Sequence, residues 1–284
     1  MSAARKIVVV AGTAAVVYGA WVRPRLMRWG ASDEEVAGPY PGAELVPDGE
    51  RAATMAITID APPDQVWPWL VQMGGDRGGW YSWDRLDNRG RPSAREVHPE
   101  WQDLNLGDNV KYSTRTGPVD AWEVAALEPD RFLGLHGLSD LRGHRLDSMQ
   151  LRPSAYTEGL WGFLLKELPG GRTRLVISGY QVVRPRWIER FTNYWLYIPV
   201  VWPMQARMLA VLKRNIERAA TAAHKRSPLE GPPSPRRMPG TRHEPGPSGP
   251  PSADRASQSH TMHRVTAAVR SWQSKGSATP VPSA

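Results

Sequence analysis

The residues best suited to contact a small molecule form an aromatic cluster in the first half of the chain. Trp80, Tyr81 and Trp83 lie within four positions, Asp84 follows directly, and Trp101 lies further along. Such side chains combine a large apolar area with N–H and O–H groups that can hold a ligand. We expect them to line the mouth of a cavity. Packing of short helices against a sheet is the alternative explanation for the same residues.

Two more aromatic residues lie on predicted strands. Trp161 precedes Gly162 on one strand, and Tyr180 lies on the next strand along the chain. Neighbouring residues of a strand face opposite sides, so Trp161 and Gly162 point apart. We predict Trp161 and Tyr180 as cavity walls, although core packing would select the same residues. The predicted ligand-binding set is therefore Trp80, Tyr81, Trp83, Asp84, Trp101, Trp161 and Tyr180.

Acid–base chemistry would need a carboxylate or a histidine inside this cavity. The candidates near the aromatic residues are Asp84, Asp87, His98, Glu100 and, at a strand end, His136. A buried carboxylate with a neighbouring histidine can transfer protons. Surface solvation or helix capping is the alternative, because carboxylates are seldom fully buried. The sequence therefore leaves the catalytic residues unknown, and an inward-pointing candidate would favour an enzyme.

Several classes of site are missing from the sequence. The chain has no cysteine, which excludes disulfides, thiolate metal sites and a cysteine nucleophile. Gly74-Gly75 and Gly78-Gly79 lack the residues of a phosphate-binding loop, and no Gly-x-Ser-x-Gly elbow is present. His260 and His263 have helical spacing but no further ligands nearby. We expect neither a metal nor a cofactor.

The elements that must position these residues follow from hydrophobic periodicity. Alternation with period two predicts strands over residues 51–59, 109–113, 121–127, 131–136, 156–168 and 173–183. Pro169-Gly170-Gly171 predicts a hairpin turn between the last two strands. Helical patterns cover residues 66–71, 80–87 and 187–223, the last interrupted by Pro199 and Pro203. This order predicts an α+β fold in which a curved antiparallel sheet wraps a long C-terminal helix.

The N-terminus contains a sixteen-residue uncharged run, residues 7–22, between Lys6 and Arg23. A membrane span usually needs about 20 apolar residues, with a lower limit near 17. Tyr18 and Trp21 suit a membrane interface, and the flanking basic residues can extend into water. We predict a single-pass membrane anchor of unassigned orientation. A cleaved signal peptide and a helix packed on the soluble domain are the alternatives.

A second apolar segment, residues 191–202, is uncharged, aromatic and too short to span a bilayer. We predict that it rests on the same membrane near a cavity entrance; a buried helix is the alternative. The tail from Lys225 onward holds nine basic and three acidic residues and eleven prolines. We predict it to be disordered. Contact with nucleic acid or anionic lipid through this tail is an alternative function, although we do not expect nucleic acid as a partner.

The domain organisation follows from these boundaries. We predict an N-terminal hydrophobic helix over residues 1–30, a linker over 31–50, a folded domain over 51–224 and the basic tail over 225–284.

Short sequence motifs of this folded domain resemble those of the SRPBCC proteins, which are START-like and Bet v 1-like and are often labelled polyketide cyclase/dehydrase. The resembling segments are residues 56–63, 66–74, 78–84, 100–104 and 106–108. Residues 28–36 and 41–42 resemble the lead-in of an actinobacterial subgroup that often carries a hydrophobic N-terminal helix. The resemblance covers roughly residues 20–223 and excludes the tail.

The resemblance implies a helix-grip fold with a deep apolar cavity between the sheet and the long helix. Family members bind lipids, sterols, polyketides or other hydrophobic molecules, and a minority catalyse cyclisation or dehydration. No catalytic motif is shared across the family, so no catalytic residue is carried over. We therefore expect a membrane-associated protein that binds a hydrophobic small molecule or lipid. A cyclase/dehydrase-type enzyme is the alternative.

Overall fold

A computed structural model describes residues 2–113, 119–147, 150–192, 194–195 and 198–226 of the chain. The chain divides into two units, Met1–Pro232 and Pro233–Ala284, and all described residues belong to the first. Apart from its first two residues, the predicted basic tail lies outside the described residues, as do His260 and His263.

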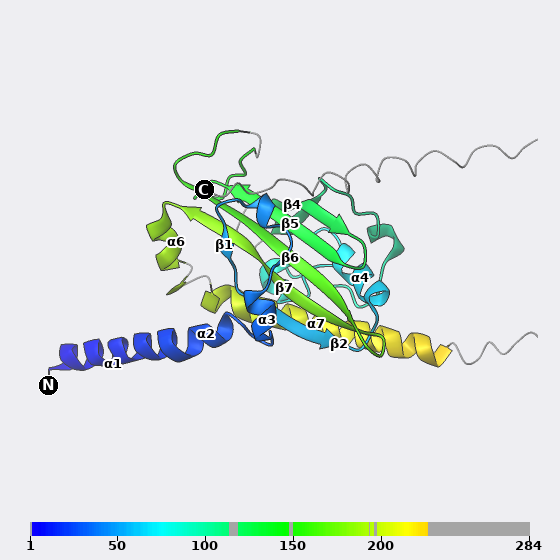
Figure 1. Ribbon diagram of the computed structural model, residues 1–284, viewed down its shortest axis with the longest axis horizontal. Helices are drawn as coiled ribbons and strands as arrows, with labels where there is room; N and C mark the ends of the chain where they lie inside the picture. Colours follow the sequence, from blue (N-terminus) through cyan, green and yellow to red (C-terminus); the bar gives the residue numbers. More distant parts are fainter. Residues whose placement is uncertain (1, 114–118, 148–149, 193, 196–197, 227–284) are drawn as a thin grey trace, which may run out of the picture. The chain divides into compact units, whose positions relative to one another are not determined.

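Seven antiparallel strands form one curved sheet (Figure 1). They are β1 (Glu50–Arg51), β2 (Met55–Ile59), β3 (Asn109–Ser113), β4 (Val119–Glu128), β5 (Phe132–Ser139), β6 (Tyr156–Leu168) and β7 (Arg172–Arg184). The order is β1-β7-β6-β5-β4-β3, and β2 also pairs with β7. The strand predicted over residues 51–59 is thus two short strands on one partner.

The β6–β7 hairpin is the longest pairing in the sheet, and its turn lies where the sequence places it. Leu168 pairs with Arg172, so Pro169, Gly170 and Gly171 form the connection. Both glycines have positive φ, at 83° and 65°. Residues with a Cβ adopt this backbone region at a cost, which explains why the turn is built from glycine.

The helices of the domain are α4 (Pro63–Val71), α5 (Asp84–Asp87), η3 (Pro99–Trp101), α6 (Arg186–Thr192) and α7 (Ile198–Arg226). The helix predicted over residues 80–87 is wrong in its first half, because Tyr81 has a φ of 57°, which an α-helix does not allow. The predicted break at Pro203 is also wrong, since α7 continues through it. Pro199 lies in the first turn of α7, where its missing N–H removes no helical hydrogen bond.

The main core lies between one face of the sheet and the helices α4 and α7. Trp69 of α4, Phe163 of β6, Leu175 of β7, and Leu209 and Leu212 of α7 are all at most 1% exposed. The sequence prediction of an α+β fold, with a curved antiparallel sheet and a long C-terminal helix, is confirmed at this level.

The opposite face of the sheet is covered by the segment before β1, which contains α3 (Asp33–Ala37) and η2 (Ala43–Leu45). Tyr40 is buried against Phe132 and Val176. Its hydroxyl donates to the Val176 carbonyl (3.1 Å) and accepts from the Ser178 amide (3.2 Å). The stretch predicted as a linker, residues 31–50, therefore packs on the sheet along part of its length.

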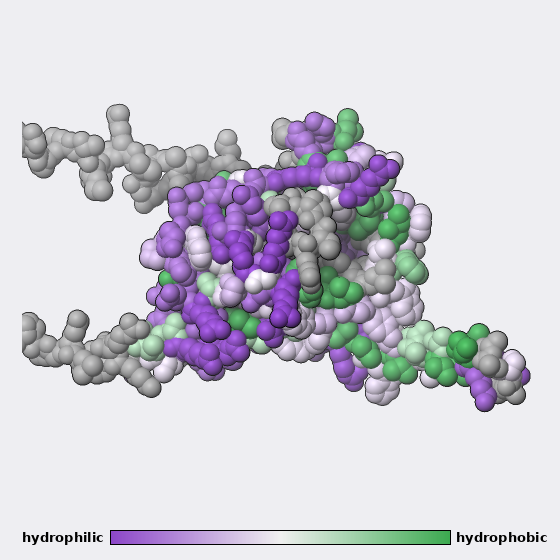
Figure 2. Space-filling view, turned by 180° about the vertical axis from the view of Figure 1, so that it is seen from behind, coloured by the Kyte–Doolittle hydropathy of each residue, from purple (hydrophilic) through white to green (hydrophobic). Residues whose placement is uncertain are grey.

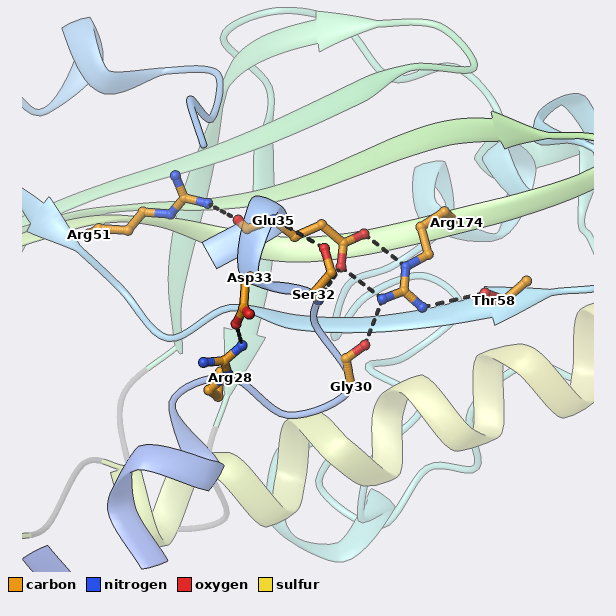
Figure 3. Close-up of polar contacts among 8 residues, drawn as sticks. All are labelled: Arg28, Gly30, Ser32, Asp33, Glu35, Arg51, Thr58 and Arg174. Carbon is orange, nitrogen blue, oxygen red and sulfur yellow. Dashed lines mark hydrogen bonds and ion pairs between the residues drawn. The ribbon is translucent and has the colours of Figure 1, made fainter. Parts of the chain in front are cut away.

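This covering segment is fastened by Glu35 and Arg174, which Figure 3 shows together with their neighbours. Arg174 Nε and Nη2 each donate to the Glu35 carboxylate at 2.8 Å, and Nη2 also donates to the Gly30 carbonyl at 2.6 Å. The Glu35 and Ser32 side chains form a capping box at the start of α3. The hydrogen bond from the Arg174 guanidinium lowers the pKa of Glu35, so the carboxylate stays ionised to a lower pH than an ordinary glutamate.

The N-terminal helical stretch consists of α1 (Ala3–Val17), the π-helical turn η1 (Tyr18–Val22) and α2 (Arg23–Leu26). Its part from Arg5 to Leu26 is long and apolar enough to cross a membrane by length and composition, and none of that part is buried. Figure 2 shows apolar surface along this helix, beside a largely hydrophilic face of the domain. A signal sequence would pass the same test.

Candidate functional site

A cavity of about 360 Å³ lies between the sheet and the first half of α7. Side chains from five strands or their flanking loops, from α5 and from α7 meet around it. Its lining residues are Ala52, Ala53, Trp80, Ser82, Asp87, Tyr112, Trp122, Gly159, Leu160, Trp161, Ser178, Tyr180, Gln181, Val201, Met204, Gln205 and Met208. Most of this lining is apolar, and Asp87 is its one acidic member among the described residues.

The cavity continues into a wider hollow of about 860 Å³. The two hollows share Tyr112, Trp122, Gly159, Gln181 and Val201. The wider hollow extends to apolar side chains of α6 and of the first turn of α7, among them Ile188 and Val200. We take this wider hollow as the mouth of the cavity.

Indole rings form the wall on the sheet side of the cavity. The Trp161 ring stacks on Trp80 with 5.5 Å between the ring centroids, and it lies 6.0 Å from Trp122. Trp122 in turn lies 6.2 Å from the Tyr112 ring. Gly137 on the adjacent strand leaves room for Trp122, because a Cβ there would meet its ring at 3.0 Å. The wall is therefore a continuous aromatic surface.

Three of the seven predicted ligand-binding residues border this cavity: Trp80, Trp161 and Tyr180. Trp80 and Trp161 belong to the aromatic wall. Tyr180 borders the cavity from β7, while its hydroxyl donates to the Tyr40 carbonyl (2.8 Å) and its ring packs against the cluster on the opposite face. Tyr180 is thus also part of the structure that holds the covering segment.

Tyr81 and Trp83 lie outside the cavity lining. Tyr81 is fully buried against Trp69, with ring centroids 6.1 Å apart, and its hydroxyl accepts from Gln72 Nε2 at 2.7 Å. Burial raises the pKa of Tyr81 to about 12, so it stays protonated. Trp83 is 39% exposed and lies under the Arg207 guanidinium at 5.5 Å. Both residues make packing contacts, and Tyr81 also lines a separate hollow of about 680 Å³.

Asp84 and Trp101 are likewise outside the cavity lining. The Asp84 carboxylate accepts hydrogen bonds from Ser93 N (3.1 Å), Ser93 Oγ (2.7 Å) and Asn88 Nδ2 (3.1 Å), which ties the loop after α5 to the helix start. The Trp101 ring lies 4.3 Å from His98. The predicted aromatic cluster is therefore divided, with only its first member at the cavity.

Among the acid–base candidates, Asp87 lines the cavity and the others do not. His98 Nδ1 lies 3.3 Å from the exposed Glu100 carboxylate. His136 Nε2 lies 3.1 Å from Glu158, which also accepts from Arg152. His136 borders a separate hollow of about 150 Å³, whereas Glu158 lines the wider hollow at the mouth of the cavity. The sequence reasoning named Asp87 among several carboxylates but gave no reason to prefer it.

Asp87 has an unusual environment for a carboxylate. Burial raises its pKa from 3.8 to about 6, against the opposing effects of the Ser82 hydroxyl and the Arg207 charge. Its Oδ1 is buried and has no hydrogen-bond partner among the described residues, and the same is true of Ser82 Oγ nearby. The indole Nε1 atoms of Trp80 and Trp161 are also buried and unpartnered there.

Sequence reasoning missed part of the wall. Trp122 carries a usable signal, because it lies two positions before the buried Val124 on the same strand and therefore on the same face. Met204 and Met208 share a face of α7 with the core residue Leu212, and the sequence does not show that they border a cavity. In the described part of the chain, no group of three or more His, Asp or Glu side chains could hold a metal ion.

No family model matches this chain. No curated protein matches it in sequence either. Solved structures with partial likeness include protein MLL2253 from Mesorhizobium loti, at 21% identity over 58% of this chain and 97% of that one, with a TM-score of 0.34. Protein Ms6760 from Mycobacterium smegmatis has 16% identity over 62% and 98%, with a TM-score of 0.35. TM-scores this low carry no argument about the fold or the function.

Proposed function

We propose that this protein is a membrane-anchored helix-grip domain that binds a hydrophobic small molecule or lipid in the cavity between the sheet and α7. The observation that carries the proposal is the indole-lined cavity, whose mouth is lined on the side of α6 and α7 by the apolar residues Ile188, Val200 and Val201. Pockets for small molecules are concave and mostly apolar, with volumes of about 300–1,000 Å³ and a few polar groups that fix orientation. Met204 and Met208 supply adaptable surface opposite the indole wall.

The surroundings of the mouth support delivery of the ligand from a membrane. Trp187 and Phe191 of α6 are 71% and 59% exposed, and Val200 in the first turn of α7 is 63% exposed. Val200 also lines the mouth. Exposed apolar and aromatic side chains grouped in this way are typical of membrane or protein interfaces. The apolar segment of residues 191–202 that the sequence predicts to rest on a membrane falls within this region, and residues 193 and 196–197 lie outside the described structure.

The end of the apolar N-terminal helix contacts the same region. Tyr18 stacks on Trp195 with 5.4 Å between ring centroids, and its hydroxyl donates to the Tyr194 carbonyl at 2.7 Å. The Arg23 guanidinium lies 4.6 Å from the centre of the Tyr194 ring. A membrane crossed by residues 5–26 would therefore lie next to α6, and an apolar ligand could enter the mouth without crossing water.

A cyclase/dehydrase-type enzyme is the second candidate, and Asp87 is the observation that favours it. A carboxyl group with a pKa near 6 is suited to proton transfer at neutral pH. On this account Asp87 would move a proton on a bound hydrophobic substrate, and Asp87→Asn would abolish turnover with a much smaller loss of substrate affinity.

Native mass spectrometry of the full chain, released from lipid nanodiscs after expression in a bacterial host, tests the binding proposal. We expect a stoichiometric adduct that denaturation releases as a small apolar molecule. A clean apo mass, unchanged after incubation with a total lipid extract, would contradict the proposal.

A further inference from the structure

The cavity wall contains hydrogen-bonding groups whose needs the described protein does not meet. Asp87 Oδ1 and the nearby Ser82 Oγ have no hydrogen-bond partner among the described residues, and the Nε1 atoms of Trp80 and Trp161 lack an acceptor. All four residues line the same cavity. A buried polar group without a partner costs about 1–3 kcal/mol, so unpaired groups in a native structure call for an explanation.

The carboxylate and the two indoles among these groups are held in place by the fold, so a chance arrangement of mobile side chains does not explain them. Trp80 is only 5% exposed and stacks on Trp161. Asp87 closes α5, whose start is fixed by the Asp84 bonds to Ser93. The unpaired groups therefore form a fixed polar subsite within an otherwise apolar cavity.

The chemistry of the subsite selects a class of ligand. A carboxylate oxygen needs a hydrogen-bond donor, whereas indole N–H groups need an acceptor. A single hydroxyl group meets both needs, because its O–H donates and its lone pairs accept. An alkane carries neither group, and a quaternary ammonium carries no acceptor.

We propose that the ligand of this cavity is an apolar alcohol or phenol whose hydroxyl group donates to Asp87 and accepts from the indole N–H of Trp80 or Trp161. This inference rests on the proposed binding function, since it names the ligand class for the same cavity. The charged neighbours that act on Asp87 are Asp84, which disfavours its ionisation, and Arg207, which favours it. The Ser82 hydroxyl also favours the ionised form.

Two probes of nearly equal shape separate the hydroxyl from the apolar body: 2-naphthol and 2-methylnaphthalene. The full chain carries 13 tryptophans, so it can be labelled with 5-fluorotryptophan and studied in lipid nanodiscs by ¹⁹F NMR. Trp80→Phe assigns the Trp80 resonance. Titration of that resonance with each probe gives the apparent affinity in wild type, in Asp87→Asn and in the exposed-carboxylate control Asp64→Asn.

We expect both probes to shift the Trp80 resonance in wild type. Asp87→Asn should lower the affinity for 2-naphthol about fivefold, because a hydrogen bond to a charged group is stronger than one to a neutral group by about 1 kcal/mol. The same variant should change the affinity for 2-methylnaphthalene by less than about twofold, which also shows that it is folded. Asp64→Asn should change neither affinity.

A pH titration of wild type provides a second test that needs no variant. The affinity for 2-naphthol should fall about fivefold as Asp87 becomes protonated below about pH 6, while that for 2-methylnaphthalene stays constant. Equal effects on both probes, or none on 2-naphthol, would overturn the hydroxyl assignment and leave the cavity function standing. Failure of both probes to shift Trp80 would overturn the binding function and this inference together.

Discussion

At the scale of single residues, Asp87 lies in a cavity wall made mainly of indole rings. Its raised pKa predicts how the stability of the fold changes with pH. The folded chain holds this proton more tightly than the unfolded chain, so ionisation opposes folding as the pH rises from 3.8 through about 6. Asp87→Asn should therefore raise the free energy of unfolding at about pH 7.5, by about 1 kcal/mol because the group is partly screened by solvent.

Denaturant unfolding followed by tryptophan fluorescence checks this prediction at two pH values. Below about pH 4 the wild-type carboxyl is neutral in both states, so the gain from Asp87→Asn should disappear. Asp64→Asn serves as the matched control, and it should not raise the free energy of unfolding at either pH. A destabilising effect of Asp87→Asn at neutral pH would show that the carboxylate supports the fold.

Two glycines on the paired strands β6 and β7 give a second prediction at this scale. A Cβ at Gly179 would lie 1.8 Å from the Leu160 carbonyl oxygen, a backbone atom that cannot move aside, whereas a Cβ at Gly159 would lie 3.5 Å from its nearest neighbour. Gly179→Ala should therefore lower the free energy of unfolding by about 3 kcal/mol or more, and Gly159→Ala by less than about 1 kcal/mol. Equal losses in thermal unfolding would contradict the packing described for β6 and β7.

The site was only partly predictable from single residues. Trp80 and Trp161 were foreseen as cavity residues because large aromatic side chains lay where the resemblance implied a cavity. Asp84 was placed in the predicted ligand-binding set, whereas Asp87 was named only among the acid–base candidates, although only three positions separate them. The choice depends on the positive φ of Tyr81 and on the bonds from Ser93 to Asp84, which together orient the single turn of α5. Sequence periodicity carries no signal for either feature.

At the scale of elements, the segment before β1 is predicted to depend on one ion pair. The Glu35 side chain is 9% exposed and that of Arg174 is 20% exposed, so breaking the pair leaves a guanidinium with few other partners. Glu35→Gln should lower the free energy of unfolding by about 2 kcal/mol at neutral pH. It should also speed proteolytic cleavage within residues 31–49.

The neighbouring exposed pair of Arg28 and Asp33 provides the control, because the Asp33 side chain is 87% exposed. Asp33→Asn should lower the free energy of unfolding by less than about 1 kcal/mol. The effect of Glu35→Gln should shrink as the pH falls through the lowered pKa of Glu35, where wild type loses the same charge. Equal effects of the two variants would show that the Glu35–Arg174 pair does not hold the segment.

Element prediction worked where the pattern is local. Strand β6 has the predicted bounds and its turn the predicted residues, because period two and a Pro-Gly-Gly sequence act over a few neighbouring positions. The segment of residues 31–50 is rich in Gly, Pro and acidic residues, and its packing depends on Tyr40 contacting strands more than 90 positions away. Such long-range contacts leave no periodic signal in the segment itself.

At the scale of the whole molecule, the proposed membrane position predicts which surfaces meet lipid. The chain has no cysteine, so Trp187→Cys or Phe191→Cys can each carry a single nitroxide label. In lipid nanodiscs, we expect electron paramagnetic resonance to show both labels protected from a water-soluble nickel relaxant and accessible to oxygen, as at a membrane interface. A label at Arg172→Cys provides the aqueous control.

Arg172 and α6 lie at opposite ends of β7, which rises about 3.4 Å per residue over 13 residues. The control label should therefore stay accessible to the nickel relaxant. Equal accessibility of all three labels would contradict a membrane position for α6. It would leave the cavity without a route from the bilayer.

The most direct test of the central claim locates the ligand in the cavity by filling that cavity. Gly159 lines it and has room for a Cβ, so Gly159→Leu should occupy the space without breaking β6. Glu167→Leu adds the same side chain at an exposed position of the same strand and serves as the control. Native mass spectra of the full chain from nanodiscs should show a stoichiometric apolar adduct on wild type and on Glu167→Leu, and none on Gly159→Leu. An adduct retained by Gly159→Leu, or absent from wild type, would contradict the account.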